Sequence, residues 1–119
     1  MMFDKITEVS LLYDFYGKLL TERQQQVMSL YHEENYSLSE IAEEFSISRQ
    51  GVHDALKNAE RALNEYEEKL GLMKRFEESR NAIEKIEESL DKIREEHKDD
   101  EVLSAKLSEI KDIIENLEL

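Results

Sequence analysis

Residues 38–57, LSEIAEEFSISRQGVHDALK, decide the fold of this 119-residue chain. Their larger apolar side chains recur at helical spacing on both sides of a short polar turn, as in two short helices that cross steeply. Small Ala42 leaves room for the second helix to approach the first closely. The stretch therefore predicts a helix-turn-helix, with apolar positions at Ile41, Phe45, Ile47, Val52 and Leu56.

Capping sequences predict where the neighbouring helices begin and end. Residues 21–24 (TERQ) and 37–40 (SLSE) both fit the capping box, in which a hydroxyl and a Glu or Gln side chain satisfy each other's backbone N–H groups. We expect Ser48 to cap a fourth helix, and Gly71 to end it in the left-handed conformation. Ser46 stands in the turn where glycine is usual. The four predicted helices cover 4–19, 22 to about 34, 38–45 and 49–70.

Apolar stripes on these helices predict one core. The first stripe is broad enough to contact more than one partner helix. It comprises Ile6, Val9, Leu12, Tyr13, Phe15, Tyr16, Leu19 and Leu20, and the second helix adds Val27, Met28, Leu30 and Tyr31. The fourth helix contributes Val52, Leu56, Ala59, Leu63, Tyr66 and Leu70.

Beyond Gly71 the sequence becomes rich in Glu and Lys, with narrow apolar stripes interrupted at 97–100 (HKDD). This pattern predicts two amphipathic helices in a coiled-coil hairpin or an intermolecular bundle; alternatively, they cap the first core. We therefore predict a helix-turn-helix domain over 1–71 and an acidic helical tail over 72–119. The stripes can pair within one chain or between two chains as a homodimer. They are Phe76, Ile83, Ile86, Leu90 and Ile93, then Leu103, Leu107, Ile110, Ile114 and Leu117.

The composition supports an all-α protein and limits its function. The chain has no proline, three glycines and 38% charged residues. It has no cysteine, so disulfides and thiolate metal sites are excluded. We expect no membrane segment, because no apolar run approaches the roughly 18 residues that span a bilayer. The N-terminus lacks the pattern of a signal peptide, so we expect a cytoplasmic protein.

A basic, amide-rich strip lies along the predicted fourth helix. Four of its side chains are spaced four residues apart and form one row, because such positions share a helix face. They are Arg49, His53, Lys57 and Arg61. This helix is the second one of the helix-turn-helix. Arg and Gln near the start of such a helix can form bidentate hydrogen bonds to the edges of guanine and adenine. Ser48 and the free N–H groups of the first turn can bind a phosphate, and Gly51 lets a backbone approach. The predicted nucleic-acid-binding residues are Ser48, Arg49, Gln50, His53, Lys57 and Arg61.

The charge of the chain opposes this interpretation. The formal net charge is -13, with 14 acidic and 7 basic residues in 1–71 and 15 and 9 in 72–119. Both parts should therefore repel nucleic acid at long range. Asp54 interrupts the strip, and Glu40, Glu43 and Glu44 lie on the preceding helix. Some helix-turn-helix units serve as plain packing units, in which such a strip is simply a solvated surface.

We expect no catalytic activity, cofactor or metal. His32, His53 and His97 stand far apart in the sequence without ligand-like spacing. No Gly-rich phosphate loop, nucleophile elbow or HExxH motif is present. The paired glutamates lie on amphipathic helices, where such pairs are solvated faces.

The segment 13–71 resembles region 4 of bacterial sigma factors. The stretch that carries this resemblance is LLTERQQQVMSLYHEENYSLSEIAEEFSISRQGVHDALKNAERAL. The motifs FYGKLLTERQ and SRQGVHDALKNAE, together with the acidic helical tail, are similar to the YlxM family more specifically. These are small proteins of Gram-positive bacteria encoded beside signal recognition particle genes. The resemblance covers about 6–110 and is close over 11–71. It places the sigma-like recognition positions at Ser48, Arg49, Gln50, His53 and Lys57, although the chain is acidic and lacks a region 2.

The resemblance implies a non-catalytic DNA-binding regulator linked to the signal recognition particle pathway. Its partner would be DNA or RNA, contacted through the fourth helix, or the particle's protein or RNA. The alternative is an acidic adaptor that docks on a basic component such as the particle's GTPase, without sequence-specific DNA binding. The charge of -13 and the apolar seam of the tail favour that alternative.

Overall fold

The computed structural model describes residues 4–117, and these contain helices and no strand. The predicted all-α class is therefore confirmed. The contacts divide the chain into two compact units, one ending at Met73 and one beginning at Lys74. The elements are α1 (Lys5–Tyr16), the 3₁₀ turn η1 (Gly17–Leu19), α2 (Glu22–His32), α3 (Leu38–Phe45), α4 (Arg49–Leu70), α5 (Leu72–Glu96) and α6 (Glu101–Glu115).

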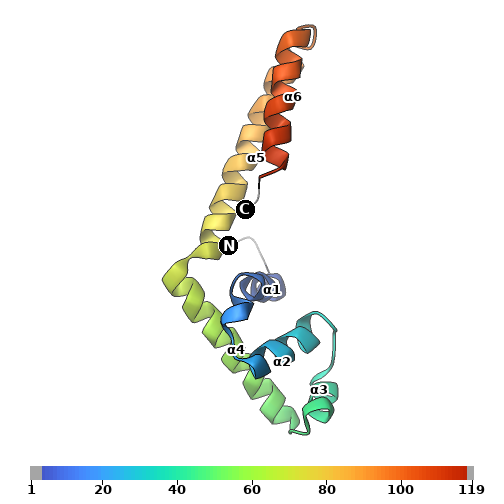
Figure 1. Cartoon of the computed structure of the whole chain (residues 1–119), viewed down its shortest axis with the longest axis vertical. Helices are drawn as coiled ribbons and strands as arrows, with labels where there is room; N and C mark the ends of the chain where they lie inside the picture. Colours follow the sequence, from blue (N-terminus) through green and yellow to red (C-terminus); the bar gives the residue numbers. More distant parts are fainter. Residues whose placement is uncertain (1–3, 118–119) are drawn as a thin grey trace. The chain divides into compact units, whose positions relative to one another are not determined.

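In the first unit, α1, α2 and α3 each pack against α4, and α2 also packs against α3 (Figure 1). The apolar stripes meet in one buried cluster, which confirms most of the predicted core. Its members are Val9, Leu12, Tyr16, Leu20, Val27, Met28, Ile41, Ala42, Val52, Leu56, Ala59, Leu63 and Met73. Met73, which no predicted stripe included, is among the most buried of these residues.

The predicted capping boxes form as pairs of reciprocal bonds. Thr21 Oγ1 accepts from the Gln24 N–H at 3.2 Å, and Gln24 Oε1 accepts from the Thr21 N–H at 3.1 Å. Ser37 and Glu40 make the same pair at the start of α3. These bonds satisfy backbone donors that have no partner within the helix. The beginnings of α2 and α3 are therefore fixed by local sequence.

The turn between α3 and α4 is built around Ser46. This residue is left-handed, with φ 54° and ψ 43°, as expected at the position that glycine usually occupies. The Ile47 N–H reaches back to the Ala42 carbonyl at 3.0 Å and closes a Schellman-type end. Gly71 ends α4 in the same conformation, with φ 64°.

Some predicted core positions are exposed instead. The α1 helix ends at Tyr16 rather than at residue 19, and the tighter 3₁₀ turn that follows rotates Leu19 off the buried stripe. Ile6 lies in the first turn of α1 and is exposed. The second helix ends at His32 rather than near residue 34. The other exposed members of the predicted stripes are Tyr31, Ile47 and Leu70.

Tyr16 and Glu67 tie the first turn of α5 to α1 and α4. The Tyr16 hydroxyl donates to Glu67 Oε1 at 2.6 Å and accepts from the Leu72 N–H at 2.9 Å. The same carboxylate oxygen accepts from the Met73 N–H at 2.9 Å. Burial, together with the bond to Glu67, raises the pKa of the Tyr16 phenol, which stays a neutral donor. The first unit therefore extends two residues past the predicted boundary at 71.

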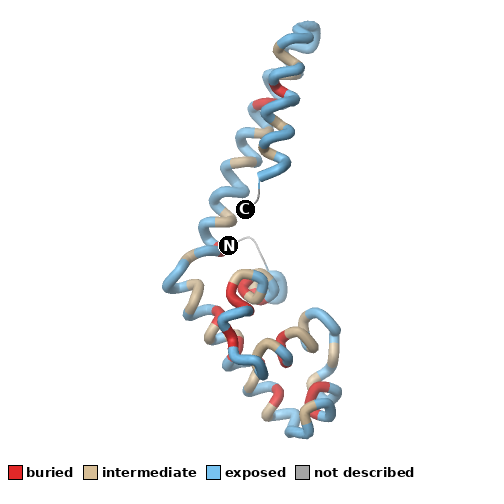
Figure 2. The backbone as a smooth tube through the Cα atoms, in the orientation of Figure 1, coloured by how far each residue is buried: buried red, intermediate tan, exposed pale blue. Residues whose placement is uncertain are grey.

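The second unit is the α5–α6 hairpin, so the two tail helices pair within one chain. Leu90 and Leu107 are its buried residues among those described, and most of its surface is exposed (Figure 2). Lys111 Nζ lies 2.7 Å from Asp91 Oδ1, and Arg94 Nη2 donates to Ser108 Oγ at 2.8 Å. The polar break at 97–100 forms the turn.

Candidate nucleic-acid interface

The site begins at Ser48, the N-cap of α4. Its Oγ accepts from the Gly51 N–H at 2.9 Å, as the sequence predicted. A Cβ built on Gly51 would lie 3.2 Å from this oxygen. The space beside Gly51 is therefore used by the cap of its own helix. This contact gives glycine a local structural reason at position 51, and the approach of a nucleic-acid backbone there stays a prediction.

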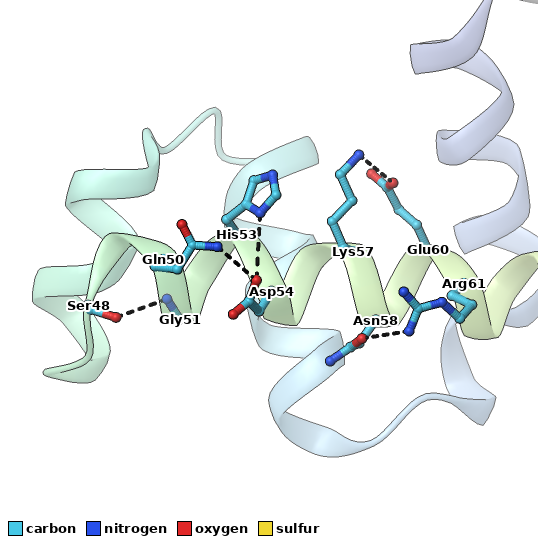
Figure 3. A network of polar contacts seen from close by, with 9 residues as sticks. All are labelled: Ser48, Gln50, Gly51, His53, Asp54, Lys57, Asn58, Glu60 and Arg61. Carbon is cyan, nitrogen blue, oxygen red and sulfur yellow. Dashed lines mark hydrogen bonds and ion pairs between the residues drawn. The ribbon is translucent and has the colours of Figure 1, made fainter.

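The six predicted binding residues run from the N-cap of α4 to just past the middle of the helix. Figure 3 shows His53 and Lys57 extending from one side of the helix, while the side chain of Arg61 turns toward Asn58. The opposite side of α4 is buried through Val52 and Leu56. The predicted residues are Ser48, Arg49, Gln50, His53, Lys57 and Arg61, and each is exposed.

Asp54 is the centre of the polar contacts in this strip. Gln50 Nε2 donates to Asp54 Oδ1 at 2.9 Å, and His53 Nδ1 lies 3.8 Å from the same oxygen (Figure 3). The amide of Gln50 is therefore held by a carboxylate of its own helix. Its Oε1 remains as an acceptor, and any base contact through its Nε2 must displace Asp54.

The remaining cations of the strip differ in how they are held. Lys57 Nζ lies 3.7 Å from Glu60 Oε2, and Arg61 Nη1 donates to Asn58 Oδ1 at 2.9 Å. Exposed pairs of this kind contribute little to stability and are broken easily by a competing partner. Arg49 makes no side-chain hydrogen bond or ion pair within the described part of the chain. It is therefore the strip's most available cation.

The local charge of the strip is close to neutral. Residues 49–61 contain three Lys or Arg and two Asp or Glu, so their net charge is +1. The preceding α3 adds three glutamates. The strip is consequently less acidic than the chain around it, but it is not a strongly basic patch.

A cation–π contact that sequence reasoning missed supports α3 from the side of α2. The Arg23 guanidinium carbon lies 4.5 Å from the centre of the Phe45 ring. Ile41 and Ala42 of α3 are buried in the same unit. The two partners are 22 positions apart and on different helices, so residue spacing could not have revealed the contact.

Other kinds of site receive no support from the described residues. Among residues 4–117, no three His, Asp or Glu side chains are grouped so that they could hold a metal ion. No helix in that range is both long and apolar enough to cross a membrane. The described cavities are open; one of about 560 Å³ lies between α1, α2 and α3 and is lined by Tyr13, Tyr36 and Phe45 together with polar side chains.

Comparison with known proteins gives a consistent assignment. Residues 3–103 match the model of the UPF0122 family, described as "Putative helix-turn-helix protein, YlxM / p13 like". A UPF0122 protein of Thermoanaerobacter sp. (strain X514) is 48% identical over 118 residues, covering 99% of this chain and all of that protein. The Halalkalibacterium halodurans protein is 48% identical over 76% of this chain and 84% of its own length. The Listeria welshimeri protein is 44% identical over 76% of this chain and 83% of its own length.

Proposed function

Because this chain belongs to the UPF0122 family of YlxM/p13-like helix-turn-helix proteins, we propose that it is a nucleic-acid-binding regulatory protein without catalytic activity. The contact surface is the strip on α4 comprising Ser48, Arg49, Gln50, His53, Lys57 and Arg61. The observation that carries the proposal is that all six side chains are exposed on one helix whose opposite side is buried.

Arg49 and the first turn of α4 make the primary contact. A second helix of this kind enters a groove with its N-terminal residues toward the bases. Arg49 follows the cap Ser48 directly and has no intramolecular partner among the described residues, so its guanidinium can bond to guanine or to a phosphate. The N–H groups at this end favour an anion as well.

The charge of the strip predicts modest affinity with a small salt dependence. Three cations neutralise about three phosphates, which gives a slope of log K against log salt of about -2 to -3. The carboxylates of Asp54 and Glu60 compete for Gln50 and Lys57, so they reduce affinity further. We therefore expect weaker binding than that of proteins that contact nucleic acid through a strongly basic patch.

The setting we propose is the cytoplasmic signal recognition particle pathway, with the particle's RNA as one target of the strip. This part rests on the resemblance of the FYGKLLTERQ and SRQGVHDALKNAE motifs to the YlxM family. The sigma region 4 resemblance supports duplex DNA as the other target. The two targets differ in groove geometry: a helix can enter the major groove of DNA but not that of A-form RNA.

Binding of the full chain to duplex DNA and to the particle's RNA, at low and moderate salt, tests the proposal. Arg49→Ala and Lys57→Ala should each weaken binding several-fold, and loss of Lys57 should reduce the salt slope by about 1. Lys69→Ala is the matched control, because Lys69 is exposed in the last turn of the same helix. Equal affinity of wild type, Arg49→Ala and Lys57→Ala would exclude the strip as the contact surface.

A second candidate function is an acidic adaptor that docks on a basic protein, such as the particle's GTPase. It is favoured by the net charge of -13 and by the 15 acidic residues in 72–119. Binding of that GTPase to the full chain separates the two functions. If Arg49→Ala and Lys57→Ala weaken RNA binding and leave GTPase binding intact, the adaptor uses another surface. Association of the GTPase should also weaken as salt rises.

A further inference from the structure

The α5–α6 hairpin leaves large apolar side chains in contact with solvent, among them Ile86, Ile93, Val102, Ile110, Ile113 and Leu117. Ile86 is 49% exposed, Ile93 38%, Ile110 42% and Ile113 65%. Single exposed apolar residues are ordinary on protein surfaces. These residues recur with helical spacing, so their placement around each helix decides whether they form one surface.

Two cross-helix contacts define one edge of the hairpin as polar. Asp91 pairs with Lys111 at 2.7 Å, and Arg94 donates to Ser108 at 2.8 Å. Each residue advances about 100° around a helix, so Asp91 and Arg94 lie on one side of the buried Leu90 of α5. Ser108 and Lys111 lie on the corresponding side of the buried Leu107 of α6. This edge is closed by hydrogen bonds and an ion pair.

The opposite edge is apolar and open. By the same rotation, Ile86 and Ile93 lie on the other side of Leu90 from Asp91 and Arg94. On α6, Ile110 lies on the other side of Leu107 from Ser108 and Lys111. In an antiparallel pair these two sides are adjacent. We name the apolar edge by its residues, Ile86, Ile93, Leu103, Ile110 and Ile114, of which Leu103 and Ile114 are half-buried.

The distribution of charge around the hairpin indicates which kind of partner can cover the apolar edge. Helical rotation places most of the hairpin's carboxylates toward the polar edge, including Glu84, Glu88, Glu95, Asp112 and Glu115. The flank beyond the apolar edge carries Lys85, Lys92 and Lys106 with Glu96 and Glu109, and on α6 it also includes the exposed Ile113 and Val102. The apolar edge is thus bordered by both signs of charge and is nearly neutral, although the chain as a whole carries -13.

We propose that two copies of this chain pair through the apolar edge and join their hairpins into a four-helix bundle. A two-fold interface must be complementary to itself, and an apolar centre with a mixed-charge border meets that condition. Elsewhere the acidic surface would repel a second copy. The bundle completes the burial that one hairpin lacks, since a bundle core needs a stripe from each of its helices.

This pairing goes beyond the proposed nucleic-acid contact and does not depend on it. A dimer carries two α4 strips, so binding to a target with two sites gains from effective concentration. Weak binding by a single near-neutral strip would be compensated in this way.

Sedimentation equilibrium of the full chain at high micromolar concentration tests the proposal. Wild type should sediment as a dimer, and Ile93→Glu and Ile110→Glu should sediment as monomers. Asn81→Glu is the matched control and should remain dimeric, because Asn81 is exposed on the side of α5 opposite Leu90. A monomeric wild type, or a dimer that persists in both isoleucine variants, would overturn the proposal.

Cysteine cross-linking tests the same edge without a buried charge. The chain has no cysteine, so each variant contains a single thiol. Ile93→Cys or Ile110→Cys should form a disulfide-linked dimer under mild oxidation, and Asn81→Cys should not. Equal cross-linking of all three variants would contradict pairing through the apolar edge, even if the glutamate variants lose helical structure.

Discussion

The two units bury their apolar residues to very different extents. The first unit gathers thirteen buried residues from all of its helices into one cluster. In the hairpin, Leu90 and Leu107 are buried, while all of its isoleucines are exposed or half-buried. Since burial of apolar surface is the main favourable term in folding, the first unit can be stable by itself. The hairpin leaves most of its apolar stripe uncovered.

Truncating one apolar side chain in each unit should give the largest contrast. Leu63 is fully buried in α4, so Leu63→Ala should cost about 2–5 kcal/mol through lost burial and the cavity left behind. Ile86→Ala in the hairpin should cost less than about 1 kcal/mol, since half of that side chain is already exposed. Urea unfolding followed by circular dichroism, at concentrations below dimer formation, measures both. Equal losses would mean that the hairpin has a core of its own.

The same difference explains how well the sequence predicts each unit. In the first unit, capping boxes fix the helix starts because their partners are three residues apart, and helical periodicity indicates which side of each helix is buried. The contacts within the strip also follow local spacing: Gln50 and Asp54 are four apart, and Lys57 and Glu60 are three apart. The Arg23–Phe45 contact and the burial of Met73 depend on tertiary packing. For the hairpin, heptad spacing predicts two helices, but it does not determine which chain supplies the partner.

The network that holds Leu72 and Met73 within the first unit should be next in sensitivity. Tyr16→Phe removes the donor to Glu67 and the acceptor for the Leu72 N–H, so part-buried polar groups lose their partners. We expect a loss of about 1–3 kcal/mol. Tyr66→Phe is the control, because its hydroxyl makes an exposed 3.3 Å bond to the Leu19 carbonyl. If both variants lost the same stability in urea unfolding, the Tyr16 network would contribute no more than a single exposed hydrogen bond.

Acidification should destabilise the first unit through His32. Burial lowers the pKa of His32, and the charge of the nearby Glu60 opposes this shift only in part. The Nε2 atom of His32 is buried without a hydrogen-bond partner among the described residues. A depressed pKa means that the folded state favours the neutral ring. Its stabilisation is present above the unfolded pKa of about 6.5 and is lost as pH falls below it.

The unfolding free energy measured between about pH 7.5 and pH 5 tests this dependence around the His32 pKa. The pH-dependent loss should be reduced in His32→Gln and unchanged in His97→Gln, because His97 is exposed in the turn of the hairpin. A profile that His32→Gln leaves unaltered would assign the pH dependence to other groups.

The smallest effect concerns the two left-handed helix ends, Ser46 within the first unit and Gly71 at its junction with α5. A left-handed non-glycine residue is strained by about 1–2 kcal/mol, while glycine loses more conformational entropy on folding. Ser46→Gly should therefore stabilise the protein by about 0.5–1 kcal/mol, and Gly71→Ser should destabilise it by a similar amount. A Cβ at Gly71 would meet no atom within 4 Å, so this second change isolates backbone strain. If Gly71→Ser left the thermal midpoint unchanged while Ser46→Gly raised it, the backbone at position 71 would accept a side chain without strain, which would contradict the expected loss at this helix end.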